Sequence, residues 1–228
     1  MTAVMLQKWL RLTFLHWRYP VAEIAARLPR GLELDTFDGD AWVGLVPFSL
    51  EDWRPSGLPA VPWISHFPET NLRTYVRSRD GVGGVWFFSL DAARLPAVLG
   101  AQAIFHLPYR WSKMEIRGGG SGVEYRSRRL WSRSQAHTDI AIEPGLSLAK
   151  DELATFLTER YRLYSVIAGR LTYTAIEHDP WPLRSGRLIR LRQSLTSAEK
   201  LSEPSGAPLI HYSDGVEARI ALPRPVPS

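Results

Sequence analysis

The segment FHLPYRWSKM, at 105–114, gathers ionisable side chains behind a Leu-Pro step. The phenol of Tyr109 can donate a hydrogen bond to a carbonyl oxygen, and the guanidinium of Arg110 can hold a carboxylate through two parallel hydrogen bonds. The amine of Lys113 is the kind of group that forms an imine with a carbonyl compound. Together with His106, these residues predict a site that handles small organic acids or carbonyl compounds.

A second candidate segment, PETNLRTYV at 68–76, carries a row of polar side chains that alternate with apolar ones or threonine. Side chains two apart on a strand point to the same face, so the row would share one face. Its members are Glu69, Asn71, Arg73 and Tyr75. Facing a barrel interior they would bind a small polar ligand, and facing solvent they would form an ordinary strand surface. The Pro- and Trp-rich segment 50–68 predicts a covered region, which favours the interior.

The third candidate segment, IEHDPWPL at 176–183, ends in a Pro-Trp-Pro turn. His178 and Trp181 are candidate ligand-binding residues there. The alternative is a capped turn in which Trp181 packs on the body of the protein, and the sequence does not distinguish the two.

Metal and cofactor sites have no signature in this chain. The six histidines show no spacing typical of a metal site, and the chain has no cysteine. A nucleophile elbow, a phosphate-binding loop and a dinucleotide fingerprint are all missing from the sequence. We therefore expect no metal and no cofactor.

Composition narrows the class of protein. With 228 residues, 45% of them hydrophobic, one domain over 1–228 is expected. The net charge of +5 comes from arginines spread along the chain, and the densest run, RSRRLWSR at 126–133, alternates as a solvated strand face would. We therefore expect no nucleic-acid partner.

Targeting signals are also missing. The apolar N-terminal segment is interrupted by charged residues, and no run approaches the roughly 18 apolar residues of a membrane span. No membrane association and a cytoplasmic location are expected. The aromatic loop at 50–68 is a candidate surface for homo-oligomer formation.

The elements that must position these residues are mostly strands. Alternation and turn residues predict a hairpin over 32–48 with its turn near 38–39, a hairpin around DGVGG at 80–84 and a third around GGGSG at 118–122. Helices are expected across 95–103 and 149–158. Roughly eight or more strands with two to four short helices favour a mainly β (α+β) fold, a closed antiparallel sheet around an interior pocket.

Several motifs, in this order and spacing, resemble the YqjF-like family of uncharacterised bacterial proteins. They are LPRGLELDTFDGDAWVGLVPF, ETNLRTYV, GVWFFSLDA, FHLPY, FLTERYRLY and HDPWPL. This family is placed in the acetoacetate decarboxylase-like superfamily, so the resemblance implies a cone-shaped antiparallel β-barrel enclosing a small-molecule pocket.

Acetoacetate decarboxylases carry a segment of the type Gly-Arg-Glu-x-x-x-Tyr-Pro-Lys-Lys, whose first lysine forms a Schiff base. The second lysine lowers the pKa of the first, which is a known case of nucleophile activation. Aligning on the proline places Tyr109 at the nucleophile and Arg110 at its cationic neighbour, and Glu69 corresponds to the pocket glutamate. Tyrosine forms no imine, and arginine stays protonated. The resemblance therefore implies the scaffold without the signature reaction, unless Lys113 takes the role.

Three functions follow from these residues. The first is an enzyme, a lyase, isomerase or hydrolase that acts on a small carbonyl or carboxylate compound without a Schiff base, with Glu69, Tyr109 and Arg110 as candidate catalytic residues. The second is a protein that binds or senses such a compound without turnover. The third is a decarboxylase-like lyase that uses Lys113.

Overall fold

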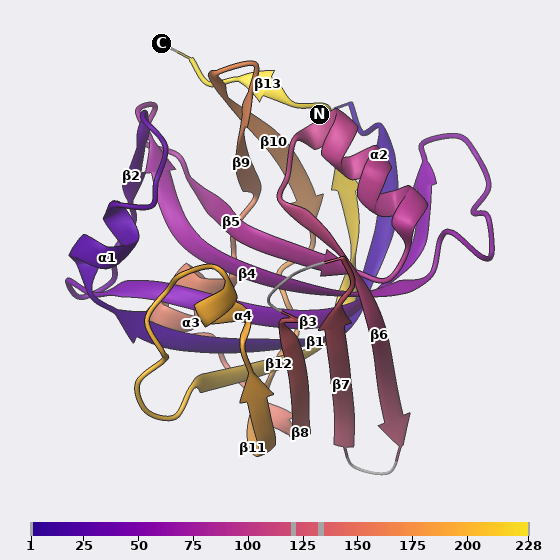
Figure 1. Ribbon diagram of the computed structural model, residues 1–228, viewed down its shortest axis with the longest axis vertical. Helices are drawn as coiled ribbons and strands as arrows, with labels where there is room; N and C mark the ends of the chain where they lie inside the picture. The colour runs from indigo at the N-terminus through magenta and orange to yellow at the C-terminus, as the bar shows by residue number, and fades with distance from the viewer. Residues whose placement is uncertain (1, 120–121, 132–134, 228) are drawn as a thin grey trace.

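One continuous sheet of 13 strands organises the residues that the computed structural model describes, 2–119, 122–131 and 135–227 (Figure 1). The strands are β1 (Met5–Tyr19), β2 (Leu32–Leu34), β3 (Ala41–Pro55), β4 (Phe67–Ser78), β5 (Gly83–Ala92), β6 (Tyr109–Gly119), β7 (Gly122–Arg129), β8 (His137–Ser147), β9 (Arg162–Ile167), β10 (Arg170–His178), β11 (Leu183–Gln193), β12 (Leu209–Ile220) and β13 (Arg224–Pro225). The helices within these residues are α1 (Val21–Ala25), α2 (Leu95–Phe105), α3 (Glu152–Thr158) and α4 (Leu195–Ala198).

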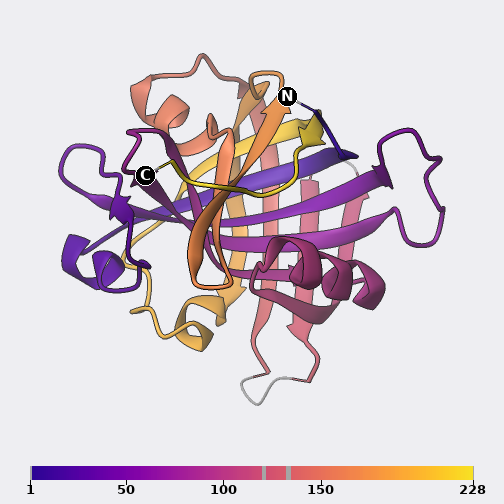
Figure 2. The same cartoon turned by 90° about the horizontal axis from the view of Figure 1, so that it is seen from above.

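The sheet closes on itself twice. A closed 9-strand barrel runs in the order β5-β6-β7-β8-β11-β12-β1-β3-β4 and returns to β5. A second ring uses the same five strands β5, β4, β3, β1 and β12, and it closes through the β9–β10 hairpin instead. The two rings therefore share a wall of five strands, and the β9–β10 hairpin crosses in front of this wall in Figure 2.

The two rings separate because β5 and β12 each divide one edge between two partners. On β5, Val85 and Trp86 pair with β9, whereas 90–92 pair with β6. Gly84 permits the first of these contacts, because a Cβ atom there would lie 2.6 Å from the backbone oxygen of Arg162. On β12, 218–220 pair with β10 and 211–213 pair with β11.

The middle strand of the shared wall, β3, is buried on both faces. In β3, every residue from 41 to 50 is buried, the pattern of a strand that is covered on both sides. Leu45 packs into the barrel core with Tyr125 and Ile140. Val46 and Phe48 point the other way, into the second ring. One face of the shared wall thus fills the barrel, and the other faces the second ring.

The expected mainly β, closed-barrel architecture with a few short helices is confirmed. The hairpin around 80–84 joins β4 to β5, and β6 pairs with β7 as expected, although two residues of its turn, 120 and 121, lie outside the described part of the chain. The hairpin expected over 32–48 is wrong. β2 pairs with β4 rather than β3, because β1 and β4 already occupy the two edges of β3.

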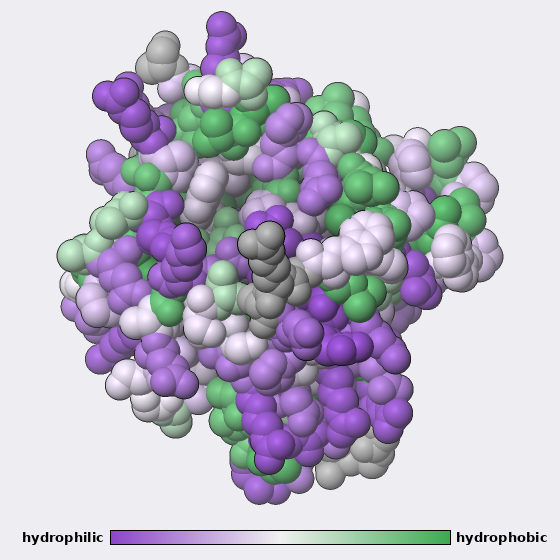
Figure 3. Space-filling model, in the orientation of Figure 1, coloured by the Kyte–Doolittle hydropathy of each residue, from purple (hydrophilic) through white to green (hydrophobic). Residues whose placement is uncertain are grey.

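The outer face of β6, β7 and β8 is hydrophilic, and it occupies the lower part of Figure 3. Arginines there meet carboxylates: Arg126 lies 3.4 Å from Glu124 on the same strand and from Asp139 on β8, and Arg190 of the adjacent β11 lies 3.0 Å from Asp139. This face is charged but largely compensated. Among the described helices, none is long and apolar enough to cross a membrane.

Candidate functional site

A cavity of about 280 Å³ lies inside the second ring. The shared wall, α2, the β9–β10 hairpin and the turn that carries Trp181 enclose it. Most of its lining is apolar or aromatic. The polar members of the lining are Gln7, Glu69, Asn71, Arg73, Tyr109, Thr158, Arg160 and His178. An apolar pocket with a few convergent polar groups is the usual form of a small-molecule site, and the volume of this one lies just below the usual range.

Strand β4 supplies the central polar row of the cavity. Glu69, Asn71 and Arg73 all line it, as strand alternation predicts. Their apolar neighbour Leu72 points into the core of the 9-strand barrel. The row therefore faces an enclosed cavity rather than solvent, but this cavity belongs to the second ring and not to the interior of the 9-strand barrel. That the row binds a ligand stays a prediction.

Glu69 is the most perturbed acid of the cavity. Its side chain is only 3% exposed, and burial raises its pKa from 4.5 to about 8. A hydrogen bond from Tyr109 opposes this shift, and the nearby Asp91 charge adds to it. Glu69 is therefore mostly protonated at neutral pH, and it changes charge close to that pH.

Tyr109 is the partner of Glu69. Its hydroxyl donates a long hydrogen bond to the carboxyl group, with the oxygens 3.3 and 3.5 Å apart. Burial and the Glu69 charge raise the pKa of Tyr109 well above its ordinary value, so the phenol remains a donor. The end of α2 sets its position, because His106 ends that helix in the left-handed conformation (φ 50°) and the amide of Gln102 donates to the Tyr109 carbonyl oxygen at 2.9 Å.

Arg73 brings a positive charge to the cavity without an acidic partner in the described chain. No described carboxylate lies within 4.0 Å of its guanidinium nitrogens. One Nη atom donates to the Leu157 carbonyl oxygen at 3.3 Å, and Nε is buried with no hydrogen-bond partner in the described part of the chain. The guanidinium carbon lies 5.5 Å from the Phe14 ring and 5.7 Å from the Tyr75 ring. Its charge is therefore available to an anionic ligand.

Arg160 lies near Arg73 but is already paired. Its Nη1 atom lies 2.7 Å from an oxygen of Asp35, and its guanidinium carbon lies 4.2 Å from the Phe156 ring. Burial and, less strongly, the Arg73 charge lower the pKa of Arg160, while Asp35 opposes this change. This arginine lies two residues after the end of α3, within a segment that the sequence analysis used only for the family resemblance. Its place in the cavity wall depends on the second ring, which no local pattern reveals.

The turn after β10 contributes both of its candidate residues to the cavity. The His178 Nδ1–H donates to the Asp179 carbonyl oxygen at 2.8 Å, which leaves Nε2 as an acceptor in the neutral ring. Burial lowers the pKa of His178, so the neutral form prevails. Trp181 packs between Trp9 and Phe14, and its buried indole N–H has no partner within the described residues. The turn is both packed on the body and part of the cavity.

Four sequence-predicted residues lie elsewhere, which corrects their expected place. Tyr75 continues the β4 row, but it is fully buried behind the cavity, and its hydroxyl lies 2.5 Å from His16 Nε2. His106 caps α2 and is exposed. Arg110 and Lys113 are both exposed on β6 and do not line the cavity. Alternation turns Arg110 away from Tyr109, whereas Lys113 shares the face of Tyr109 but lies beyond residues 109–111, where β6 pairs with β5. The segment 105–114 thus brings only Tyr109 among these residues to the cavity.

No group of three or more acidic or histidine side chains in the described part of the chain could hold a metal ion. What the cavity offers instead is hydrogen bonding at two places. One is the Glu69 and Tyr109 pair, and the other is Arg73 with its neighbours. Such groups can bind a carbonyl or carboxylate compound and move protons on it.

Solved structures that share this fold include acetoacetate decarboxylase and an acetoacetate decarboxylase-like enzyme. The enduracididine biosynthesis enzyme MppR, solved with pyruvate, superposes with a TM-score of 0.70 at 12% identity, over 99% of this chain and 91% of that chain. Acetoacetate decarboxylase from Legionella pneumophila gives 0.68 at 13% identity, over 99% and 88%. An acetoacetate decarboxylase-like enzyme from Sphingomonas wittichii RW1 gives 0.68 at 12% identity, over 100% and 95%. The fold class is therefore acetoacetate decarboxylase-like.

Within this class, the sequence itself identifies the family. The model of the DUF2071 family, which is described as an uncharacterized conserved protein, matches residues 6–217. Uncharacterized protein YqjF from Bacillus subtilis (strain 168) is 40% identical over 212 residues, which are 92% of this chain and 87% of that protein. The chain belongs to the DUF2071 family, and the YqjF-like resemblance of its motifs is confirmed.

Proposed function

We propose that this protein binds a small carbonyl or carboxylate compound in the cavity of the second ring and catalyses proton transfer on it without an imine. The observation that carries the proposal is the buried Glu69 carboxyl, whose pKa is raised to about 8, within hydrogen-bonding reach of Tyr109. An acid that changes charge near neutral pH can both give and take a proton. The reaction class is that of a lyase, isomerase or hydrolase that forms no Schiff base.

The roles follow from the chemistry of each group. Tyr109 donates a hydrogen bond to the carbonyl oxygen of the compound, where negative charge develops when a neighbouring carbon loses its proton. Ionised Glu69 takes that proton and, as the protonated acid, returns it to the carbon or to the oxygen. Arg73 holds a carboxylate of the compound. Asn71, His178 and Trp181 supply further hydrogen-bonding atoms on the cavity wall.

Proton exchange tests this proposal directly. Pyruvate, which MppR is solved with, acetoacetate and longer oxo acids are incubated with the protein in D₂O, and loss of the signals of the protons next to the carbonyl is followed by NMR. We expect exchange of at least one of these acids, slowed about 100-fold or more in Glu69→Gln, because general acid–base catalysis contributes roughly 10²- to 10⁴-fold. Glu203→Gln, at an exposed position, serves as the control.

The same samples distinguish turnover from binding. Thermal stabilisation by an oxo acid without any proton exchange would show that the protein binds or senses the compound without turning it over. The apolar lining also suits this function, as does the Trp181 indole N–H, which has no partner among the residues that the structure describes. Neither exchange nor stabilisation by any acid would remove the cavity as a site for such compounds.

Imine chemistry is expected to be absent. Lys113 is exposed on β6 and does not line the cavity, so it cannot form a Schiff base with a compound held there. Incubation with pyruvate or acetoacetate and borohydride, followed by intact mass measurement, should show no adduct. A stoichiometric adduct that disappears in Lys113→Arg would restore the decarboxylase-like alternative.

A further inference from the structure

The two polar ends of the cavity are far apart. Glu69 and Arg73 are four residues apart on β4, and at about 3.3 Å per residue their α-carbons are separated by roughly 13 Å. The Arg73 head is held at its own end of the cavity, where its guanidinium carbon lies 5.5 Å from the Phe14 ring and 5.7 Å from the Tyr75 ring and one Nη atom donates to the Leu157 carbonyl oxygen. Tyr109 lies at the Glu69 end, within 3.3 Å of that carboxyl.

The wall between the two ends is apolar. Pairing across the sheet places Val46 and Leu90 on either side of Asn71, halfway between Glu69 and Arg73. Both of these apolar residues line the cavity. The Oδ1 atom of Asn71 is the polar group at this level, and it has no partner among the described residues. A molecule that reaches both ends must therefore pass through an apolar middle section.

The Arg73 end suits a single negative charge. Of the two arginines there, Arg160 already has a carboxylate partner in Asp35, whereas Arg73 has none among the described residues. One guanidinium with free N–H groups matches one carboxylate.

The geometry points to an elongated oxo monocarboxylate as the compound of this cavity, with its carboxylate at Arg73 and its carbonyl at Glu69 and Tyr109. This inference rests on the proposed function and narrows its substrate class. After allowance for the reach of the side chains, about 10 Å remains between the two ends, and an extended chain advances about 1.2 Å per bond. The carboxyl and carbonyl carbons are then separated by about six to eight bonds through an apolar spacer. In pyruvate and acetoacetate these carbons are too close to engage both ends.

A series of methyl-ketone acids tests this inference by calorimetric titration. The probes are acetoacetate, 5-oxohexanoate, 7-oxooctanoate, 9-oxodecanoate and 11-oxododecanoate, each compared with the saturated fatty acid of equal chain length. Burial of methylene groups favours longer members of both series alike, so the ratio of the two dissociation constants isolates the carbonyl contact. We expect the fatty acid to have a dissociation constant about tenfold or more above that of the oxo acid for 7-oxooctanoate and 9-oxodecanoate. For acetoacetate the two constants should agree within about twofold.

Two variants assign the ends. Tyr109→Phe should remove the carbonyl advantage while leaving fatty-acid binding within about twofold. Arg73→Gln should weaken the oxo acids and the fatty acids about tenfold or more, Arg73→Lys should restore part of this loss, and the exposed Arg192→Gln should change neither. Thermal melts of each variant show whether it is folded.

The possible results separate the two proposals. A carbonyl advantage that is the same at every length, or greatest for acetoacetate, overturns the elongated ligand but leaves the proposed function in place. Failure of every acid to bind the folded wild type overturns both. A length optimum that disappears in Tyr109→Phe supports both.

Discussion

Replacing Glu69 with glutamine is expected to stabilise the protein by about 4 to 5 kcal/mol at pH 8.5 and to change its stability little at pH 4.5. Burial raises the pKa of this carboxyl from 4.5 to about 8 in the folded protein. Below pH 4.5 the group is protonated in both states and has no effect. As the pH rises from 4.5 to 8, the unfolded chain ionises while the folded chain stays protonated, so wild-type stability falls by about 1.4 kcal/mol per pH unit.

Urea unfolding of wild type and Glu69→Gln, from pH 4.5 to 8.5, measures this difference. Glutamine is neutral at every pH, so the unfolding free energy of the variant does not fall in this way, and the two stability curves diverge as the pH rises. Glu203→Gln, at an exposed position, should run parallel to wild type throughout. Parallel curves for Glu69→Gln would show that Glu69 ionises normally, and they would remove the observation on which the proposed function depends.

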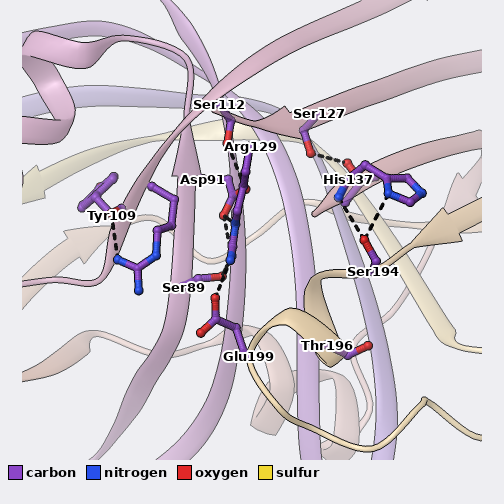
Figure 4. A network of polar contacts seen from close by, with 12 residues as sticks. Ser89, Asp91, Tyr109, Ser112, Ser127, Arg129, His137, Ser194, Thr196 and Glu199 are labelled. Carbon is purple, nitrogen blue, oxygen red and sulfur yellow. Dashed lines mark hydrogen bonds and ion pairs between the residues drawn. The ribbon is translucent and has the colours of Figure 1, made fainter. Parts of the chain in front are cut away.

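Replacing Arg129 with methionine is expected to cost about 3 to 5 kcal/mol of unfolding free energy. Figure 4 shows Arg129 at the centre of a buried network. Its guanidinium donates to both oxygens of Asp91 at 2.9 to 3.0 Å, to Ser89 at 2.7 Å and to Glu199 at 2.6 Å. The Asp91 side chain is 0% exposed, so removing Arg129 leaves a buried carboxylate without its counter-charge.

Chemical denaturation checks this expectation against two further variants. Arg126→Met, on the exposed face of the same strand, should cost less than about 1 kcal/mol, because its ion pairs are open to solvent. The double variant of Asp91→Ala with Arg129→Met should recover part of the loss, since it removes the orphaned carboxylate as well. A cost below about 1 kcal/mol for Arg129→Met alone would contradict the buried network.

Arg129 also shows how local patterns can mislead. It belongs to the run RSRRLWSR, which alternation assigns to one solvated strand face. Arg126 and Arg128 are exposed as expected, but Arg129 points inward to Asp91 on β5 and to Glu199 after α4. Its partners are 38 and 70 residues away in the chain, so no local signal places them beside it.

The amino-acid sequence by itself determined which polar residues of β4 share a face, because alternation along a strand has a period of two whatever the strand packs against. It also determined the family and the fold class, since the motifs are long and ordered. The same alternation turned Arg110 away from Tyr109. It did not separate Lys113 from Tyr109, and Lys113 misses the cavity because it lies beyond residues 109–111, where β6 pairs with β5.

Only the tertiary structure decided which side of each strand is the inside of a cavity. That choice depends on β5 and β12 dividing their edges between two sets of partners, which creates a packed barrel and a hollow ring from one sheet. It places Arg160 in the cavity wall and Tyr75 behind it. It also buries Glu69 deeply enough to raise its pKa. Pairing between distant strands and desolvation are properties of the closed fold, and no short stretch of sequence carries them.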